Sequence, residues 1–398
     1  MFPKDFLWGA ATSSHQTEGN NNNDWTDWEK NKKTPFISGE ACRHYDLFEE
    51  DFQIAKSLNH NCHRFSVEWS RIEPEKGVFD DSQINHYKDA LNSLKQKNIK
   101  TVLSLHHFTN PLWFIKLGGW LDKNSSDLFQ RFTEKIIQDL GENIDYWITI
   151  NEPNIYAYNS YLSGIWPPGE KNPFLAKKVL ENMALAHKKA YQLIHARSKQ
   201  KPLVSIAHHM RVFSGYPKTI APLNSIAAKT VDYFFNDFFL NKIKHNLDFI
   251  GLNYYTRDFI RFKISKPENL FIDIEKPILP ETGKNSLGWE IYPEGLFKIA
   301  SRLKKYKLPI LITENGICIE DDSRRWDFIS SHLKQIEKAL SDDINIIGYL
   351  YWSLVDNFEW EKGFAPKFGL VEIDYNNFSR KIRQSALKFA QVCRKNSL

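Results

Sequence analysis

Eight short apolar segments alternate with longer amphipathic ones along the chain, and this alternation constrains the fold more than any other feature of the sequence. Segments that are apolar on both faces and are followed by helical patterns are typical of strands in a parallel sheet. The segments are residues 6–13, 62–69, 100–107, 146–153, 203–210, 248–255, 309–316 and 346–353. Eight such units predict an α/β fold, a closed (β/α)8 TIM barrel in which one domain spans residues 1–398.

A doubly wound open sheet is the alternative fold, but it normally carries a glycine-rich phosphate loop, and the sequence has none. The helical periodicity of residues 46–59 predicts a helix with Asp46 as its N-cap. Residues 257–290 form the longest stretch without clear periodicity, and in a barrel they would be a βα loop on the C-terminal face.

Composition argues against several classes of protein. The net charge is +5, but the lysines are scattered along helical stretches, which indicates a solvated surface and not a nucleic-acid patch. The N-terminus lacks the pattern of a secretory signal, and no apolar run has the roughly 18 residues of a membrane helix, so a cytoplasmic protein without a membrane partner is expected. The four cysteines show no framework spacing and are expected to be free buried thiols. Without HExxH or similar ligand spacing, we expect neither a metal nor a cofactor.

Two carboxylates end apolar segments where charge is expensive. Glu152 follows "YWITIN" and Glu314 follows "PILIT". A buried unpaired charge costs several kcal/mol or more, so each glutamate either reaches solvent or serves a site. A barrel gathers its strand ends on one face, which would bring the two together. Paired carboxylates among aromatic, Asn, Gln and His side chains suggest a sugar, because cleaving a glycosidic bond needs one carboxyl as acid and a second as nucleophile or stabiliser.

These motifs carry a family resemblance. The chain resembles the β-glycosidases of glycoside hydrolase family 1, and is β-glucosidase-like, over nearly its whole length, from "FPKDFLWGAATSSHQTEG" to "GFAPKFGLVEIDY". The Asn-Glu-Pro and Thr-Glu-Asn-Gly motifs occur at strand ends in the family's order. The motifs "HRFSVEWSRI", "GLNYYTR", "GWEIYPEGL" and "WSLVDNFEW" agree with it.

The resemblance implies roles for individual residues. Glu152 matches the family's acid/base and Glu314 its nucleophile. The residues implied to bind substrate are Gln16, His107, Asn151, Tyr255, Trp352, Glu359 and Trp360. The residues implied to support the nucleophile are Arg64 and Asn253, with Tyr255 beside them. A cationic Arg64 is expected to lower the pKa of Glu314, whose charge is expected to raise the pKa of Glu152. His208 and His209 match none of these motifs and are predicted to be structural.

The implied activity is retaining exo-β-glycoside hydrolysis of a small glycoside or oligosaccharide, through a covalent glycosyl-enzyme on Glu314. β-Glucosides are the expected substrates, with β-galactosides, β-fucosides and β-mannosides left open, as are the aglycone and the oligomeric state. Departures such as His15 before Gln16 bear on this preference, and the shortness of the chain suggests trimmed loops on the aglycone side.

Three other functions need to be weighed. A transglycosidase uses the same two glutamates. A 6-phospho-β-glycosidase holds its phosphate with a Ser, Lys and Tyr set, where this chain has Glu359, Pro366 and Phe368, with Lys367 out of register. A charged Glu359 is expected to repel the phosphate. A non-catalytic sugar-binding barrel would be expected to have lost one of the glutamates, and both are present.

Overall fold

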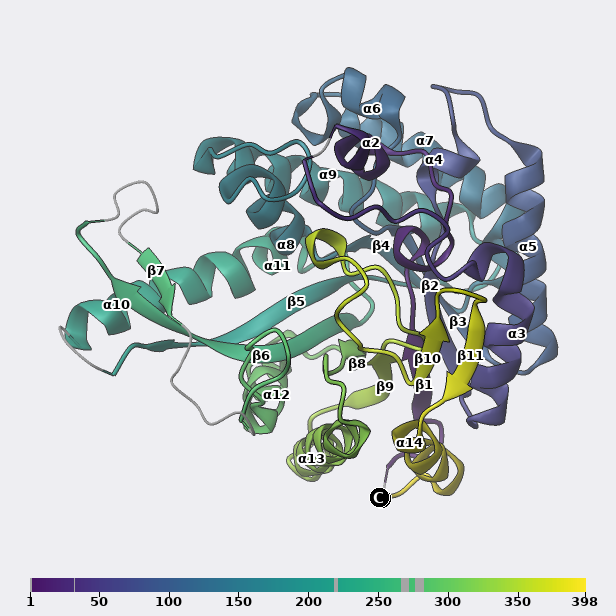
Figure 1. Ribbon diagram of the computed structural model, residues 1–398. Helices are drawn as coiled ribbons and strands as arrows, with labels where there is room; N and C mark the ends of the chain where they lie inside the picture. The colour runs from purple at the N-terminus through teal and green to yellow at the C-terminus, as the bar shows by residue number, and fades with distance from the viewer. Residues whose placement is uncertain (1, 32, 218–220, 266–271, 276–282) are drawn as a thin grey trace.

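The eight apolar segments all form strands. The computed structural model describes residues 2–31, 33–217, 221–265, 272–275 and 283–398 (Figure 1). The strands are β1 (Leu7–Ala11), β2 (Cys62–Ser66), β3 (Lys100–His106), β4 (Tyr146–Asn151), β5 (Leu203–Gly215), β6 (Ile250–Phe262), β7 (Ile272–Glu275), β8 (Ile310–Asn315), β9 (Ile346–Trp352), β10 (Val371–Asp374) and β11 (Ser379–Ile382). The first six, β8 and β9 are the predicted segments.

Those eight strands close into a parallel barrel, so the predicted fold is confirmed. Their order is β5-β4-β3-β2-β1-β9-β8-β6, and β5 pairs with β6 to complete the circle. The interior between the strands is filled by one apolar cluster. Its buried members are Leu7, Cys62, Val102, Ile148, Ala207, Phe249, Leu311 and Leu350. The interior is therefore a packed core, and chemistry is left to the strand ends.

Helices surround the barrel and pack a second, larger core against its outer face (Figure 1). The helices are α1 (Ser14–Thr17), α2 (Asp24–Lys30), α3 (His44–Ser57), α4 (Trp69–Ile72), α5 (Asp81–Gln96), α6 (Leu112–Lys116), α7 (Ser125–Leu140), α8 (Pro153–Ala157), α9 (Pro173–Arg197), α10 (Ala221–Asp232), α11 (Phe238–Ile243), α12 (Pro293–Leu303), α13 (Asp322–Ser341) and α14 (Gln384–Lys395). None of the described helices combines the length and the apolar character that crossing a membrane requires.

The start of α3 differs from the prediction. The helix begins at His44, and Asp46 lies inside its first turn instead of capping it. The Asp46 carboxylate accepts hydrogen bonds from Arg43, at 3.1 Å from Nε and 2.9 Å from Nη2. Because Arg43 occupies the N-cap position, Asp46 lies too far into the helix to cap it, and its carboxylate binds the Arg43 side chain.

Strands β5 and β6 continue beyond the barrel as a projecting arm, with β7 and α10 against them (Figure 1). The first part of the stretch predicted as a loop, Arg257–Phe262, is the end of β6, and it pairs antiparallel with β7. The alternation along this extension is weak because its burial is only partial. Residues 266–271 and 276–282 of the same stretch lie outside the described residues.

Candidate active site

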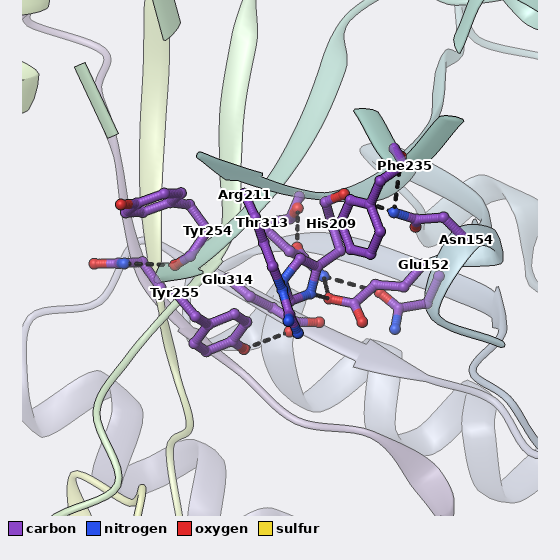
Figure 2. Close-up of polar contacts among 12 residues, drawn as sticks. Glu152, Asn154, His209, Arg211, Phe235, Tyr254, Tyr255, Thr313 and Glu314 are labelled. Carbon is purple, nitrogen blue, oxygen red and sulfur yellow. Dashed lines mark hydrogen bonds and ion pairs between the residues drawn. The ribbon is translucent and has the colours of Figure 1, made fainter. Parts of the chain in front are cut away.

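Side chains from strands far apart in the sequence meet at the carboxyl end of the barrel (Figure 2). β2 carries Arg64, β4 leads directly into Glu152, and β8 carries Glu314. Between them, Asn253 on β6 is in register with Glu314 on one side and with His209 of β5 on the other. The strand register therefore brings the two glutamates that the sequence singled out into one buried site.

Glu152 occupies an unusual backbone conformation. Its φ of 41° and ψ of 58° lie in the left-handed region, which residues other than glycine rarely adopt, and Pro153 follows as the first residue of α8. Its N–H donates to the carbonyl of Ala207 at 2.7 Å. The turn ends the strand and directs the Glu152 carboxylate toward β5 and β6. Its Oε1 there accepts hydrogen bonds from His209 Nδ1 at 2.9 Å and from Asn253 Nδ2 at 2.7 Å.

Glu314 is held by two strong donors. Arg64 Nη1 lies 2.5 Å from Glu314 Oε1, and the Tyr255 hydroxyl donates to Oε2 at 2.6 Å. The Arg64 side chain is fully buried. Both contacts stabilise the ionised carboxylate, as a nucleophile requires. Arg64 and Tyr255 thus both contact Glu314.

Burial opposes this effect. It raises the pKa of Glu314 to about 7, although Arg64 and Tyr255 lower it, and the charge of Glu152 adds to the rise. For Glu152 burial also acts upward, but His209, Asn253 and Arg64 together bring its pKa below the ordinary value. Arg64 thus lowers the pKa of Glu314 as expected, but burial outweighs it, while the polar partners of Glu152 oppose the effect of burial there.

Asn253 supports a different carboxylate from the one expected. Its Nδ2 donates to Glu152 and, at 3.2 Å, to Asn151 Oδ1, while its Oδ1 accepts from the Thr313 hydroxyl at 2.7 Å. Thr313 thereby fixes the amide with its nitrogen toward Glu152. The expectation that Asn253 holds Glu314 is corrected, since its side-chain hydrogen bonds go to Glu152, Asn151 and Thr313.

Asn151 is oriented in a similar way. Arg64 Nη2 donates to Asn151 Oδ1 at 2.6 Å, so the amide nitrogen points the other way, toward His107 Nε2 at 3.3 Å. That nitrogen is the group that could donate to a sugar hydroxyl. Asn151 and His107 are therefore neighbours in the site.

Aromatic side chains form one side of the site. The His107 ring lies nearly parallel to the rings of Trp352 and Trp360, with centroids 5.9 Å and 6.4 Å away. Trp352 Nε1 donates to Glu359 Oε1 at 3.1 Å. These four residues thus form one contiguous group that includes two indole rings, the type of side chain that packs against the C–H face of a sugar.

Gln16 has less capacity for ligand binding than the resemblance implies. Its Nε2 donates to Asn357 Oδ1 at 3.0 Å and to the Phe358 carbonyl at 2.9 Å, and its Oε1 accepts from the Ser13 hydroxyl at 2.7 Å. Both amide protons are therefore used within the protein. What remains for a sugar hydroxyl is one lone pair on Oε1.

Glu359 is not the fixed negative charge that was expected. Burial raises its pKa to about 8, an effect that the hydrogen bond from Trp352 only partly offsets. Burial therefore works against the charged form of this carboxyl, and any repulsion of a phosphate by its charge depends on pH. Lys367 lies with its ammonium group 5.0 Å from the centre of the Tyr375 ring, and Phe368 is buried in the cluster with Trp352.

His209 is the residue of this site that sequence reasoning missed. It was grouped with His208 as structural, yet it contacts Glu152 directly, whereas His208 Nε2 bonds to the Asn236 carbonyl at 3.0 Å. Strand alternation was the available signal. Ala207 packs inside the barrel, so the side chain two residues later lies on the same face, at the strand end.

Within the described residues, no group of three or more His, Cys, Asp or Glu side chains could hold a metal ion. The described part of the site consists of carboxylates, amides, histidines, aromatic rings and the guanidinium of Arg64, and all four cysteines are free and buried. The site contains two carboxyl groups, each held by its own hydrogen-bond donors, and a group of aromatic side chains beside them. It is suited to acid–base and nucleophilic chemistry on a sugar.

The comparisons with known proteins agree with this chemistry. The model of glycosyl hydrolase family 1 matches residues 1–244 and 236–398. Among solved structures, the β-glycosidase from Pyrococcus horikoshii is 38% identical with a TM-score of 0.94, over 99% of this chain and 95% of that one.

Two Thermotoga enzymes are also similar. The β-glucosidase from Thermotoga maritima, solved in complex with glucoimidazole, is 26% identical with a TM-score of 0.91, over 100% of this chain and 99% of that one. The 1,4-beta-D-glucan glucohydrolase of Thermotoga neapolitana is 29% identical over 100% of this chain and 99% of its own length. The resemblance seen in the sequence is confirmed, and the chain belongs to glycosyl hydrolase family 1 as a β-glucosidase-like glycoside hydrolase.

Proposed function

We propose that the protein is a retaining exo-β-glycosidase that hydrolyses β-glucosides, with Glu314 as nucleophile and Glu152 as acid/base. The observation that carries the proposal is the separate support of the two carboxyl groups. Both oxygens of Glu314 accept hydrogen bonds, Oε1 from Arg64 and Oε2 from Tyr255. Glu152 is held by its described partners through Oε1 alone. Names of relatives that include β-glucosidase and glucan glucohydrolase support a glucoside as substrate.

In the first step of this mechanism, a Glu314 oxygen attacks the anomeric carbon while the bond to the leaving oxygen breaks. Glu152 gives its proton to that oxygen. The product of the step is a glycosyl ester on Glu314, which no longer carries a charge. In the second step Glu152 takes a proton from water, which attacks the anomeric carbon and releases Glu314.

The reaction needs the proton on Glu152 and the charge on Glu314. A glycosidic oxygen accepts hydrogen bonds but cannot donate one, so a substrate oxygen facing Glu152 favours the protonated form of that residue. Arg64 is permanently cationic and favours the charge on Glu314. A proton moving from Glu314 to Glu152 as substrate binds would therefore produce the reactive state.

Trapping of the intermediate tests this proposal. Incubation with 2-deoxy-2-fluoro-β-glucosyl fluoride should add one fluoroglucosyl group, and peptide mass mapping should locate it on Glu314. A panel of p-nitrophenyl β-glycosides measures the sugar preference, and chromatography of the products measures transfer to a second sugar. Label on another residue, or no label on an active enzyme, would overturn the assignment.

A further inference from the structure

His209 is fixed in one orientation by the residues around it. Its ring lies between two aromatic rings: Phe235, perpendicular to it at 5.8 Å, and Tyr255, at 5.5 Å. The side chain is buried, and Nδ1 points at Glu152 Oε1 (Figure 2). The other ring nitrogen, Nε2, faces Arg211 of the same strand.

Arg211 decides which ring nitrogen carries the proton. Arg211 Nε donates to His209 Nε2 at 3.0 Å, and a guanidinium cannot give up its protons at physiological pH. Nε2 must therefore be the acceptor, so the single proton of the neutral imidazole sits on Nδ1 and is donated to Glu152. Arg211 is itself held by Asp258, whose Oδ2 lies 2.8 Å from Nη1, and its guanidinium lies 5.5 Å from the centre of the Phe235 ring.

Burial lowers the pKa of His209, and the charged groups near it act in both directions, Glu152 and Asp258 upward and Arg211 downward. The net effect is a lowered pKa, which favours a neutral ring. His208, Asp258 and Tyr255 are the remaining groups of this kind around it. His209 therefore donates a hydrogen bond without bringing a positive charge to Glu152.

We propose that His209, with its tautomer fixed by Arg211, is a positioning residue for Glu152. Together with Asn253 it immobilises Oε1, so that the other oxygen, Oε2, gives the proton to the leaving group and later takes one from water. His209 keeps its own proton throughout. This inference rests on the proposed acid/base role of Glu152. Among the described residues, the hydrogen bonds to this carboxyl group all go to Oε1, and two donors from adjacent strands fix its plane.

Leaving groups of different basicity distinguish positioning of the acid from a general structural effect. Dinitrophenolate is a weak base and departs without a proton, whereas phenolate and alkoxide need one. The kcat/KM of His209→Phe should therefore fall at least about tenfold for phenyl β-glucoside and stay within a few-fold of wild type for 2,4-dinitrophenyl β-glucoside. We define the leaving-group ratio as kcat/KM for phenyl β-glucoside divided by kcat/KM for 2,4-dinitrophenyl β-glucoside. This ratio does not depend on the fraction of folded enzyme, and loss of acid catalysis lowers it.

His208→Phe is the matched control. It makes the same substitution one position away, at a buried histidine whose Nε2 bonds to the Asn236 carbonyl. A change in packing there should alter kcat/KM by the same factor for both substrates and leave their ratio unchanged. If His209→Phe also leaves the ratio unchanged, or if His208→Phe shifts it as much, the proposal is wrong.

His209→Asn tests the role of the tautomer. An asparagine amide nitrogen can take the place of Nδ1 and donate to Glu152 without help from Arg211. The ratio of kcat/KM for phenyl β-glucoside to that for the dinitrophenyl glucoside should therefore be close to the wild-type value in this variant. Arg211→Met should reduce the ratio in the wild-type background and have no further effect in the His209→Asn background. If Arg211→Met lowers the ratio of kcat/KM for the two glucosides equally in both backgrounds, Arg211 does not act by fixing the tautomer of His209.

The pH profile gives an independent measurement. A donor to a carboxylate lowers its pKa, so removing His209 should raise the pKa of Glu152 and move the alkaline limb of kcat/KM to higher pH. Glu152→Ala separates the two levels of the argument. If Glu152→Ala lowers kcat/KM equally for both substrates, the proposed function fails. If Glu152→Ala lowers kcat/KM for the phenyl glucoside alone, but His209→Phe lowers it for both substrates, only the positioning role of His209 fails.

Discussion

Arg64 Nη1 lies 2.5 Å from Glu314 Oε1, although the two residues are 250 positions apart in the sequence. The same guanidinium holds Asn151 Oδ1 through Nη2 at 2.6 Å. One permanent charge therefore touches both the proposed nucleophile and the residue that precedes the proposed acid. The closed barrel makes this possible, because β2 and β8 end on the same face.

Removal of this charge should change the pH dependence. Arg64 lowers the pKa of Glu314, so Arg64→Met should raise it further. Because the nucleophile must be ionised, the acid limb of kcat/KM should move upward by about one pH unit or more. Arg64→Lys keeps a positive charge but cannot contact Glu314 and Asn151 at once through two nitrogens. It should therefore shift the acid limb of kcat/KM less than Arg64→Met does. An acid limb that is unchanged in Arg64→Met would contradict the assignment of Glu314.

Glu314→Ala should lower turnover by at least about 10⁴-fold, because it removes the carboxylate proposed to form the covalent intermediate. Azide or formate should partly restore activity by occupying the vacated space, and the product should then have the α configuration. Analysis by NMR measures the configuration. Rescue that yields the β product would count against Glu314 as nucleophile.

The stereochemistry of the unmodified reaction is a separate prediction. Two displacements at the anomeric carbon restore its configuration, so proton NMR of the first sugar released from a β-glucoside should show the β anomer before mutarotation. The two carboxyl groups should lie roughly 5 to 5.5 Å apart in a crystal structure of a complex. An α anomer, with a separation of about 9 Å, would indicate inversion.

Discrimination against a 6-phosphorylated sugar should increase with pH. A phosphate monoester is a dianion above its second pKa of about 6. Burial raises the pKa of Glu359 to about 8, so this carboxyl gains its charge, and begins to repel the phosphate, as the pH rises through that value. The ratio of kcat/KM for p-nitrophenyl β-glucoside to its 6-phosphate should therefore rise between pH 7 and 9.

Glu359→Gln is the control for this prediction, since its side chain has a similar size and no titration. The same ratio measured in this variant should be flat over the range. Because both substrates use the same two glutamates, titration of Glu152 and Glu314 cancels in the ratio. A wild-type ratio that is flat as well would show that Glu359 does not face the 6-position.

The barrel and the glutamate pair were predictable because they follow from patterns that are local in the sequence. Each strand is a short apolar run, and each glutamate ends one. Partners of those glutamates were harder to predict. Asn253 and His209 stand on adjacent strands, and which carboxylate they contact depends on side-chain orientations set by Thr313 and Arg211. His208 and His209 look alike in the sequence, and only the face of the strand distinguishes them.

Environment accounts for the other differences. The use of both Gln16 amide protons depends on backbone and side-chain groups more than 340 positions away. The raised pKa of Glu359 comes from burial, which no local pattern reports. The helix around Asp46 begins earlier, at His44, and the Asp46 carboxylate binds Arg43, a start that composition alone does not resolve. Strand ends are thus readable from sequence, whereas protonation and hydrogen-bond direction require the assembled site.

The left-handed backbone of Glu152 has a consequence for the stability of the whole protein. A residue with a Cβ atom in this conformation costs about 1 kcal/mol or more, and glycine adopts it freely. The position that must carry a carboxyl group for the proposed chemistry is therefore one whose backbone conformation favours glycine, and the hydrogen bonds from His209 and Asn253 help to hold the glutamate there. The proposed acid/base thus carries a conformational cost that glycine at the same position would not have.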